Sequence, residues 1–252
     1  MNLDEKIISA LKDLDYEEAT EIQKKAIPIA LKRRDILAAA QSGTGKTAAF
    51  LLPILAELLE TKQTKTILRT LILVPTRELA SQISKAVEDF SKYMDISSLA
   101  MVGGVSTKDQ EKKIAKGIDI LVATSGRLME HLKNGTVDLS SVTTVVIDEV
   151  DTMLDMGFLE DIEKILPNVG PKRQIMMFSA TMNQNVKKLA KEFLKDPVVI
   201  EVAQQRSAVK IIDQQIVLVD EANKAAALSY IIGSNNYSQV LVFVNMKIEA
   251  DT

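Results

Sequence analysis

Short runs rich in valine, isoleucine and leucine recur along the chain, separated by segments in which apolar residues repeat with helical spacing. Several of these runs are apolar at every position, which is typical of strands buried on both faces. We predict strands at residues 36–39, 71–74, 99–102, 120–123, 142–147, 174–178 and 198–202. Strands that alternate with helices predict an α/β fold in which a central, mostly parallel sheet is flanked by helices on both faces.

The segments between the strands carry helix signals. Residues 4–14 place their apolar side chains on one stripe, and Thr20 is suited to cap a helix over residues 21–26. Pro28 and Pro53 interrupt apolar periodic runs, so we expect a kink or a fresh helix start at each.

The pattern of the sequence changes after residue 202, where residues 203–210 are polar and show neither strand nor helix spacing. We interpret residues 1–202 as one domain, 203–210 as a polar linker, and 211–252 as the shortened start of a second α/β domain. This last part reads as a strand at 211–219, a helix at 222–232 and a strand at 239–244. A unit of about 40 residues is too short to bury a core of its own.

Composition narrows the function classes. The chain has 252 residues, of which 46% are hydrophobic and 26% charged, so it is globular rather than disordered or fibrous. It has no cysteine, which excludes disulfides and thiolate metal sites and indicates a reducing cytoplasm. The single His131 argues against a histidine metal site. No long apolar stretch or secretory signal occurs, so we expect a cytoplasmic protein without a membrane partner.

The net charge is only -3, so any nucleic-acid binding must be local. Basic residues cluster in three places, which we interpret as solvated helix faces: Lys62, Lys65 and Arg69; Lys108, Lys112, Lys113 and Lys116; Lys187, Lys188, Lys191 and Lys195. The methionines, among them Met153, Met156, Met176 and Met177, are interpreted as core filling.

A glycine-rich loop follows the first predicted strand, at residues 40–47. Its glycines permit a backbone that turns successive amides inward, and the following helix adds its positive end. We predict that it binds a polyphosphate through Ser42, Gly43, Thr44, Gly45, Lys46 and Thr47. In this motif the lysine reaches the β and γ phosphates and the threonine hydroxyl ligates Mg²⁺. Ala40 replaces the first glycine of the strict pattern.

A second polar constellation ends the strand at 142–147. Asp148 and Glu149 reach the carboxyl edge of the sheet, where the glycine-rich loop must also lie. There Asp148 is suited to hold Mg²⁺ and Glu149 to orient and deprotonate a water molecule. Alternatively, these acids merely solvate the end of a strand; their pairing with the loop favours the catalytic interpretation.

Asp148-Glu149-Val150-Asp151 is similar to the Asp-Glu-Ala-Asp signature of the DEAD-box ATP-dependent RNA helicases, and other segments resemble that family in order. They are the adenine segment 16–23, motif Ia at 75–80, the glycine doublet 103–104, motif Ib at 124–127, motif III at 179–181 and motif IV at 243–245. The resemblance implies a RecA-like P-loop domain followed by the start of a second one, with ATP and Mg²⁺ as ligands.

The resemblance also implies residue roles. Tyr16 and Gln23 would bind adenine, and Asp151, Ser179 and Thr181 would couple the nucleotide site to RNA. Catalysis would rest on Lys46, Asp148 and Glu149. The RNA backbone would be contacted, without sequence preference, by Pro75, Thr76, Arg77, Gly103, Gly104, Thr124, Gly126 and Arg127.

Four departures from the family pattern stand at these motifs: Val150 for alanine, Asp15 for glycine, Ala19 for proline and Ser125 for proline. The arginines that the family's second domain supplies would fall beyond Thr252. Without them we expect this chain to bind ATP but to hydrolyse it weakly.

Three functions fit the sequence. The first is an ATP-dependent RNA helicase that acts as a monomer. The second is an RNA clamp or scaffold without productive unwinding, which the intact Glu149 disfavours. The third is a DNA-directed P-loop motor, which the residues of motif Ia and the adenine segment disfavour.

Overall fold

The computed structural model describes residues 3–61, 66–202, 213 and 215–244. The chain divides into two compact units, Met1–Gln204 and Gln205–Thr252, and each is described by itself. None of the helices in the described part of the chain combines the length and the apolar character that crossing a lipid bilayer requires.

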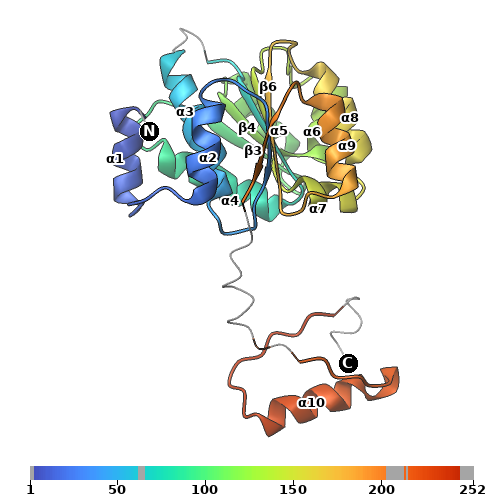
Figure 1. The fold of residues 1–252 in the computed structure, drawn as a ribbon. Coiled ribbons are helices and arrows are strands. Elements are labelled where there is room, and N and C mark those ends of the chain that lie inside the picture. Colours follow the sequence, from blue (N-terminus) through green and yellow to red (C-terminus); the bar gives the residue numbers. More distant parts are fainter. Residues whose placement is uncertain (1–2, 62–65, 203–212, 214, 245–252) are drawn as a thin grey trace. The chain divides into compact units, whose positions relative to one another are not determined.

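The first unit is built on one sheet whose strands are all parallel (Figure 1). In sequence order they are β1 (Ile36–Ala39), β2 (Thr70–Val74), β3 (Ser98–Met101), β4 (Ile120–Thr124), β5 (Thr144–Ile147), β6 (Gln174–Ser179) and β7 (Val198–Glu201). Their order across the sheet is β3-β4-β2-β5-β6-β1-β7. The predicted fold class is confirmed, and each strand predicted before residue 203 is present within two residues of its expected bounds.

Helices cover both faces of this sheet (Figure 1). They are α1 (Glu5–Asp13), α2 (Glu21–Ala30), α3 (Lys46–Glu60), α4 (Arg77–Phe90), α5 (Thr107–Ala115), α6 (Ser125–Lys133), α7 (Val150–Asp155), α8 (Leu159–Ile165) and α9 (Gln184–Phe193). One buried cluster joins α1 to α4 to one face of the sheet. A second cluster joins α6 to α9 to the other face. The central strands are therefore buried on both sides, as their uninterrupted apolar sequences predicted.

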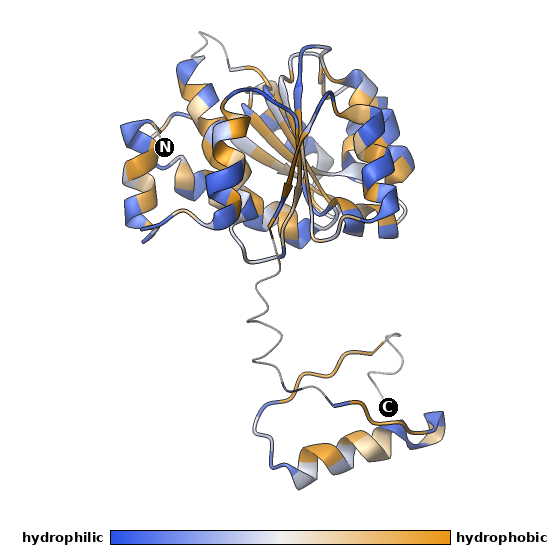
Figure 2. Ribbon diagram, in the orientation of Figure 1, coloured by the Kyte–Doolittle hydropathy of each residue, from blue (hydrophilic) through white to orange (hydrophobic). Residues whose placement is uncertain are grey.

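Helix α4 shows how the spacing of apolar residues directs this packing. Its buried residues are Ala80, Ile83, Val87 and Phe90, which are three or four positions apart and so lie on one face of a helix. Most strand residues are apolar, whereas surface helices such as α2 and α9 have one apolar and one polar side (Figure 2).

A fresh helix start, one of the two outcomes expected at each proline, does not occur. Pro28 lies inside the continuous helix α2, and Pro53 lies inside the continuous helix α3. A proline removes one backbone donor from a helix. Here the two helices pack against each other and bury apolar residues on either side of each proline, and this packing holds the helix together.

Two sequence interpretations of single side chains are corrected. Arg69 is not part of a solvated helix face: it directly precedes β2, is buried, and forms an ion pair of 2.7 Å with Asp119. Met156 is not a core residue: its side chain is 51% exposed, because the chain leaves α7 there and turns at Gly157, whose φ is +83°. The other residues of the three basic clusters are exposed, except that Lys62 and Lys65 lie outside the described residues. Met153, Met176 and Met177 are buried, as predicted.

The second unit contains the predicted helix as α10 (Lys224–Ser234). The two predicted strands are wrong for the described parts of residues 211–219 and 239–244, which form no strand. Their apolar side chains are exposed, for example Leu218 at 92% and Phe243 at 87%. A strand needs partners and a buried face to be stable, and these segments find neither among the described residues.

Candidate functional site

Every motif that the sequence singled out between β1 and the end of the first unit lies at the carboxyl end of a strand. The glycine-rich loop, residues 40–47 and here called the phosphate loop, follows β1. Asp148 follows β5, residues 179–181 end and follow β6, Pro75 follows β2, and Thr124 ends β4. Because parallel strands all end at the same edge, the fold brings these segments to one side of the sheet.

The conformation of the phosphate loop depends on its glycines. Gly43 and Gly45 have φ angles of +81° and +91°, a region that side chains with a β-carbon disfavour. Gly45 also caps α3, which begins at Lys46, so the free amides at the start of that helix face the loop. The loop thus has the backbone of an anion-binding turn.

Gln23 is tied directly to this loop. Its Nε2 donates to the carbonyl oxygen of Gly45 at 3.1 Å, and its Oε1 accepts from the backbone N–H of Thr20 at 2.9 Å. The latter bond belongs to a capping box at the start of α2, where Thr20 is the N-cap as predicted. A β-carbon added to Gly45 would lie 2.4 Å from Gln23 Nε2, so only glycine allows this approach.

Lys46 carries an unsatisfied charge. Its side chain is buried, and its Nζ has no hydrogen-bond partner in the part of the chain that the structure describes. A buried cation without a partner is costly, so this position is suited to an anion. Next to it, Thr47 is half-buried, while Ser42 and Gly43 are exposed; the Thr44 hydroxyl donates to the Gln41 carbonyl at 2.7 Å.

Asp148 is a buried carboxylate near this cation. Its N–H donates to the Leu73 carbonyl at 3.0 Å, and its Oδ1 accepts from the N–H of Glu149 at 2.9 Å. Burial raises the pKa of Asp148 to about 6, although the charge of Lys46 and the Glu149 hydrogen bond act to lower it. Among the described residues no group of three acidic or histidine side chains is assembled for a metal ion. This donor set fits Mg²⁺ held by one or two protein ligands and phosphate oxygens.

Glu149 sits at a conformationally strained position. Its φ is +51°, which is uncommon for a residue with a side chain, and it caps the start of α7. Strain of this kind clusters at functional sites. Val150, which follows it, is fully buried in the apolar cluster that includes Met153 of α7.

Asp151 connects α7 to the segment after β6. Its Oδ2 accepts from the N–H and the hydroxyl of Thr181 at 2.8 and 2.9 Å, and its Oδ1 accepts from the N–H of Ala180 at 3.4 Å. Burial raises the pKa of Asp151, but the Thr181 and Ser179 hydroxyls and these amides outweigh burial and lower it overall. The Ser179 hydroxyl is buried near Asp151 but outside hydrogen-bonding geometry, so we base the link on Thr181.

The same segment touches the phosphate loop, because the N–H of Ala40 donates to the Ser179 carbonyl at 3.0 Å. A continuous path of bonds therefore runs from the loop through β6 to α7.

A cavity of about 570 Å³ at this edge brings the predicted RNA-contact residues together. We call it the carboxyl-edge cavity. It is lined by Pro75, Thr76, Arg77, Glu78, Gly103, Thr124, Gly126, Arg127, Glu130, Met156 and Phe158. Gly104 lies beside it, since a β-carbon there would be 2.5 Å from a guanidinium nitrogen of Arg77. Three separate motifs thus form one surface.

Two predicted contact residues in this cavity already have partners. The Thr76 hydroxyl accepts from the N–H of Leu79 at 3.1 Å and so caps α4. Arg127 donates to Gln110 Oε1, to Glu130 Oε2, to the Val105 carbonyl and to the Thr107 hydroxyl. Its side chain is only 9% exposed.

Tyr16 is not brought to the phosphate loop by any recorded contact of the described residues. Its ring packs edge-on against Phe90, with the ring centroids 5.6 Å apart, and it is 45% exposed. Its preceding residue, Asp15, has a φ of +55°, the conformation for which the family's glycine is suited. The adenine role of Tyr16 stays a prediction.

Sequence reasoning missed several residues of this edge. Gln110 and His131 are buried and bonded behind Arg127, and Glu130, Met156 and Phe158 line the cavity itself. The one available signal was the spacing of Arg127 and His131, which are four residues apart and so lie on one side of a helix such as α6.

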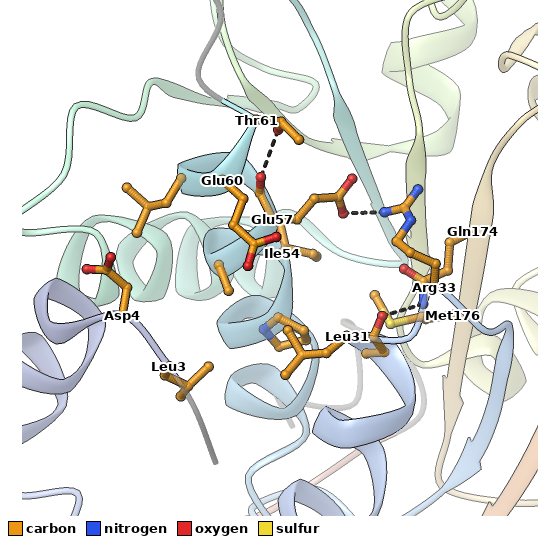
Figure 3. Close-up of a pocket in the computed structure, with 14 residues that line it drawn as sticks. Leu3, Asp4, Leu31, Arg33, Ile54, Glu57, Glu60, Thr61, Gln174 and Met176 are labelled. Carbon is orange, nitrogen blue, oxygen red and sulfur yellow. Dashed lines mark hydrogen bonds and ion pairs between the residues drawn. The ribbon is translucent and has the colours of Figure 1, made fainter.

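A larger cavity, of about 700 Å³, lies elsewhere (Figure 3). It is bordered by Gln174, the first residue of β6, and by Arg33, which pairs with Glu57 and donates to the hydroxyl of Thr144, the first residue of β5. The cavity is therefore at the amino ends of the strands, opposite the phosphate loop. None of the predicted site residues lines it.

Known proteins resemble this chain over most of its length. The family model described as DEAD/DEAH box helicase matches residues 20–189. The chain is 39% identical over 251 residues to the DEAD-box ATP-dependent RNA helicase RhpA of Helicobacter pylori, covering 100% of this chain and 50% of that one. It is 39% identical over 242 residues to the ATP-dependent RNA helicase DeaD of Escherichia coli K12, covering 96% of this chain and 38% of that one.

A solved structure resembles the fold as well. The crystal structure of a DEAD box protein from the hyperthermophile Methanococcus jannaschii matches with a TM-score of 0.76 and 35% identity, covering 92% of this chain and 62% of that one. The chain spans at most about half the length of these curated relatives.

Proposed function

This chain belongs to the DEAD/DEAH box helicase family, and from that membership we propose that it binds ATP with Mg²⁺ at the phosphate loop and the backbone of single-stranded RNA at the carboxyl-edge cavity. In a protein with a complete second RecA-like domain, ATP hydrolysis would drive local unwinding of an RNA duplex. The observation that carries the proposal is the buried Lys46 Nζ, which has no protein partner among the described residues and lies close enough to Asp148 to affect its pKa.

ATP would be held from two sides. The amides of the phosphate loop and Lys46 face the phosphates. Gln23 keeps one amide hydrogen and one lone pair beyond its bonds to Gly45 and Thr20, and this donor–acceptor pair suits an adenine edge. Tyr16 belongs to the same segment.

Thr47 and Asp148 would hold the magnesium ion. When bound, magnesium neutralises charge on the phosphate oxygens. Glu149, at the end of the same strand as Asp148, would orient the attacking water and take its proton. The strained backbone of Glu149 supports a functional rather than a structural role.

RNA would be recognised through its phosphates and sugars. The cavity is lined by two arginines, by glycine backbone and by threonines at helix starts, all of which suit phosphate oxygens and carry no base-edge readout. The link from Asp151 to Thr181 would transmit nucleotide binding to this surface.

We further propose that residues 1–202 form the first RecA-like domain, that 203–210 form a linker, and that the rest begins the second domain. Arginines of a second domain stabilise the transferred phosphoryl group in such enzymes, and losing them costs on the order of 10³–10⁵ in rate. This chain alone would therefore hydrolyse ATP weakly.

The test is ATPase activity in a longer form with a complete second domain, with single-stranded RNA or a DNA of matched sequence added. Stimulation by RNA alone supports the proposal. Equal stimulation by DNA supports a DNA motor, and turnover without duplex separation supports a clamp.

A further inference from the structure

His131 is buried directly behind the carboxyl-edge cavity, and nothing in the proposed mechanism uses it. It is the only histidine in the chain and is fully buried on α6, one helical turn after Arg127. Its Nδ1 lies 2.7 Å from the Thr136 hydroxyl, and its Nε2 lies 3.0 Å from Gln110 Oε1. A buried imidazole with a partner on each nitrogen has a defined orientation.

Gln110 joins this histidine to the cavity. It is the only buried residue of α5, and its Oε1 accepts from Arg127 Nε at 2.9 Å while its Nε2 donates to the Val102 carbonyl at 3.1 Å. Val102 directly precedes the Gly103–Gly104 turn. One amide therefore holds both Arg127 and the start of that turn.

These bonds assign the tautomer of His131. Arginine Nε only donates, so the atom of Gln110 that faces it must be the oxygen. The same oxygen faces His131 Nε2, which must then carry a hydrogen. Burial and the charge of Arg127 lower the pKa of His131, against the opposing effect of Glu130 and Glu111, so the ring is neutral at neutral pH. Nδ1 of the neutral ring must then accept, so the Thr136 hydroxyl gives its one hydrogen to Nδ1 at 2.7 Å rather than to the His131 carbonyl oxygen at 3.1 Å.

Arg127 gains a fixed geometry from this arrangement. Its recorded bonds occupy four of the five N–H groups that a guanidinium offers, and the remaining one is on Nη1 beside Glu130. The side chain crosses from α6 to the segment after the glycine doublet, since it also bonds Val105 and Thr107. A shift of Gln110 would release Arg127 and that segment together.

We infer that His131 is a positioning residue for RNA binding: through Gln110 it holds Arg127 and the Gly103–Gly104 turn in the arrangement that meets the RNA backbone. The inference rests on the proposed RNA-binding function of the cavity. His131 itself touches no RNA.

The test compares two substitutions of opposite character. His131→Gln keeps an N–H donor at the place of Nε2, whereas His131→Leu fills the space without a donor. We expect His131→Leu to weaken binding of a fluorescent single-stranded oligouridylate about three- to tenfold, because Gln110 loses a buried partner. His131→Gln should stay within about twofold of the wild type, as should the control Met129→Leu, a neutral change on the same helix.

Two readouts separate positioning from core filling. Affinity for Mg²⁺–ATP should be unchanged in all three variants, and the Arg127 Nε–H signal in ¹⁵N NMR should exchange faster with solvent only in His131→Leu. A core-filling role predicts the reverse order, with leucine at least as good as glutamine, and that result would overturn the inference.

The wild-type chain provides a check that does not depend on whether a variant folds. The ¹⁵N shifts of His131 should show the hydrogen on Nε2; a hydrogen on Nδ1 alone would overturn the inference. The wild type could bind no RNA while the Arg127 Nε–H still exchanges faster in His131→Leu. That result would support the positioning of Arg127 by His131 and would contradict the proposed RNA-binding function.

Discussion

The side-chain amide of Gln23 donates a 3.1 Å hydrogen bond to the carbonyl oxygen of Gly45, so the segment that precedes the sheet is fastened to the phosphate loop. This contact makes the loop sensitive to any change that moves either residue. It also places an amide suited to a purine edge beside amides suited to phosphates.

Gly45→Ala should therefore abolish tight nucleotide binding. The added carbon would lie 2.4 Å from Gln23 Nε2, at a φ of +91°. We expect the affinity for Mg²⁺–ATP to fall at least about tenfold and the free energy of unfolding to fall by about 1–2 kcal/mol. Calorimetry and chemical denaturation measure the two effects.

The matched control is Gly135→Ala. Gly135 has a φ of +66° with no atom within 4 Å of the added carbon. It should show the loss of stability without the loss of affinity. Equal losses of affinity in both variants would show that the Gln23–Gly45 contact is unimportant.

Asp148→Asn should stabilise the protein in the absence of nucleotide. Burial raises the folded pKa of Asp148 from 3.8 to about 6, so the unfolded state releases this proton at lower pH than the folded state. The carboxyl group thus destabilises the fold progressively as pH rises from about 4 to about 6, and fully above that. The difference between the folded and unfolded pKa values of Asp148 corresponds to a loss of roughly 3 kcal/mol, as an upper value, in the free energy of unfolding.

We expect denaturation near pH 7.5 to show that the free energy of unfolding of Asp148→Asn is higher than that of the wild type by roughly 1–3 kcal/mol, and near pH 5 by about half as much.

Asp138→Asn should behave oppositely, because hydrogen bonds from the Ser140 N–H and hydroxyl lower the pKa of Asp138. That carboxylate stabilises the fold above its unfolded pKa, and its contribution is lost as pH falls. A destabilised Asp148→Asn at neutral pH would contradict the proposed environment of this carboxylate.

Glu130→Gln should strengthen RNA binding. Glu130 lines the carboxyl-edge cavity and pairs with Arg127 Nη1 at 2.6 Å, so its carboxylate competes with phosphate for that donor. Removing the charge should tighten binding of single-stranded RNA by up to about tenfold at low salt, and less at high salt. Fluorescence anisotropy measures this change.

Glu88→Gln is the control, because Glu88 has the same charge, is 67% exposed and does not line the cavity. An equal gain in both variants would indicate a general charge effect. Weaker binding in Glu130→Gln would indicate that Glu130 holds Arg127 in its working position.

The sheet and the phosphate loop could be predicted from the sequence because their signals are local. Uniformly apolar strands such as Ile36–Ala39 are buried when helices cover both faces of a parallel sheet. Gly43 and Gly45 stand where the backbone requires positive φ.

Other features depend on tertiary partners and could not be predicted. Helices α2 and α3 run through their prolines because each supports the other. Met156 is exposed because the chain turns at Gly157, and Gln110 acquires its role from residues 17 and 21 positions away. Local patterns carry no signal of such contacts.

Glu149→Gln should separate binding from turnover. The amide keeps the size of the carboxylate but cannot take a proton, so ATP and RNA affinities should stay within about twofold while hydrolysis slows by about 10²–10⁴. Single-turnover hydrolysis, in a longer form with a complete second RecA-like domain, measures the change. Normal turnover in that variant would remove Glu149 from its proposed role.

The account depends most on the ammonium group of Lys46, which has no partner among the described residues. Isothermal titration of this chain with Mg²⁺–ATP tests it most directly. The wild type should bind one nucleotide per chain, and Lys46→Ala should bind at least about tenfold more weakly, because a buried charge-assisted contact to phosphate is lost. The absence of binding to the wild type, or equal affinity in the two proteins, would contradict the account.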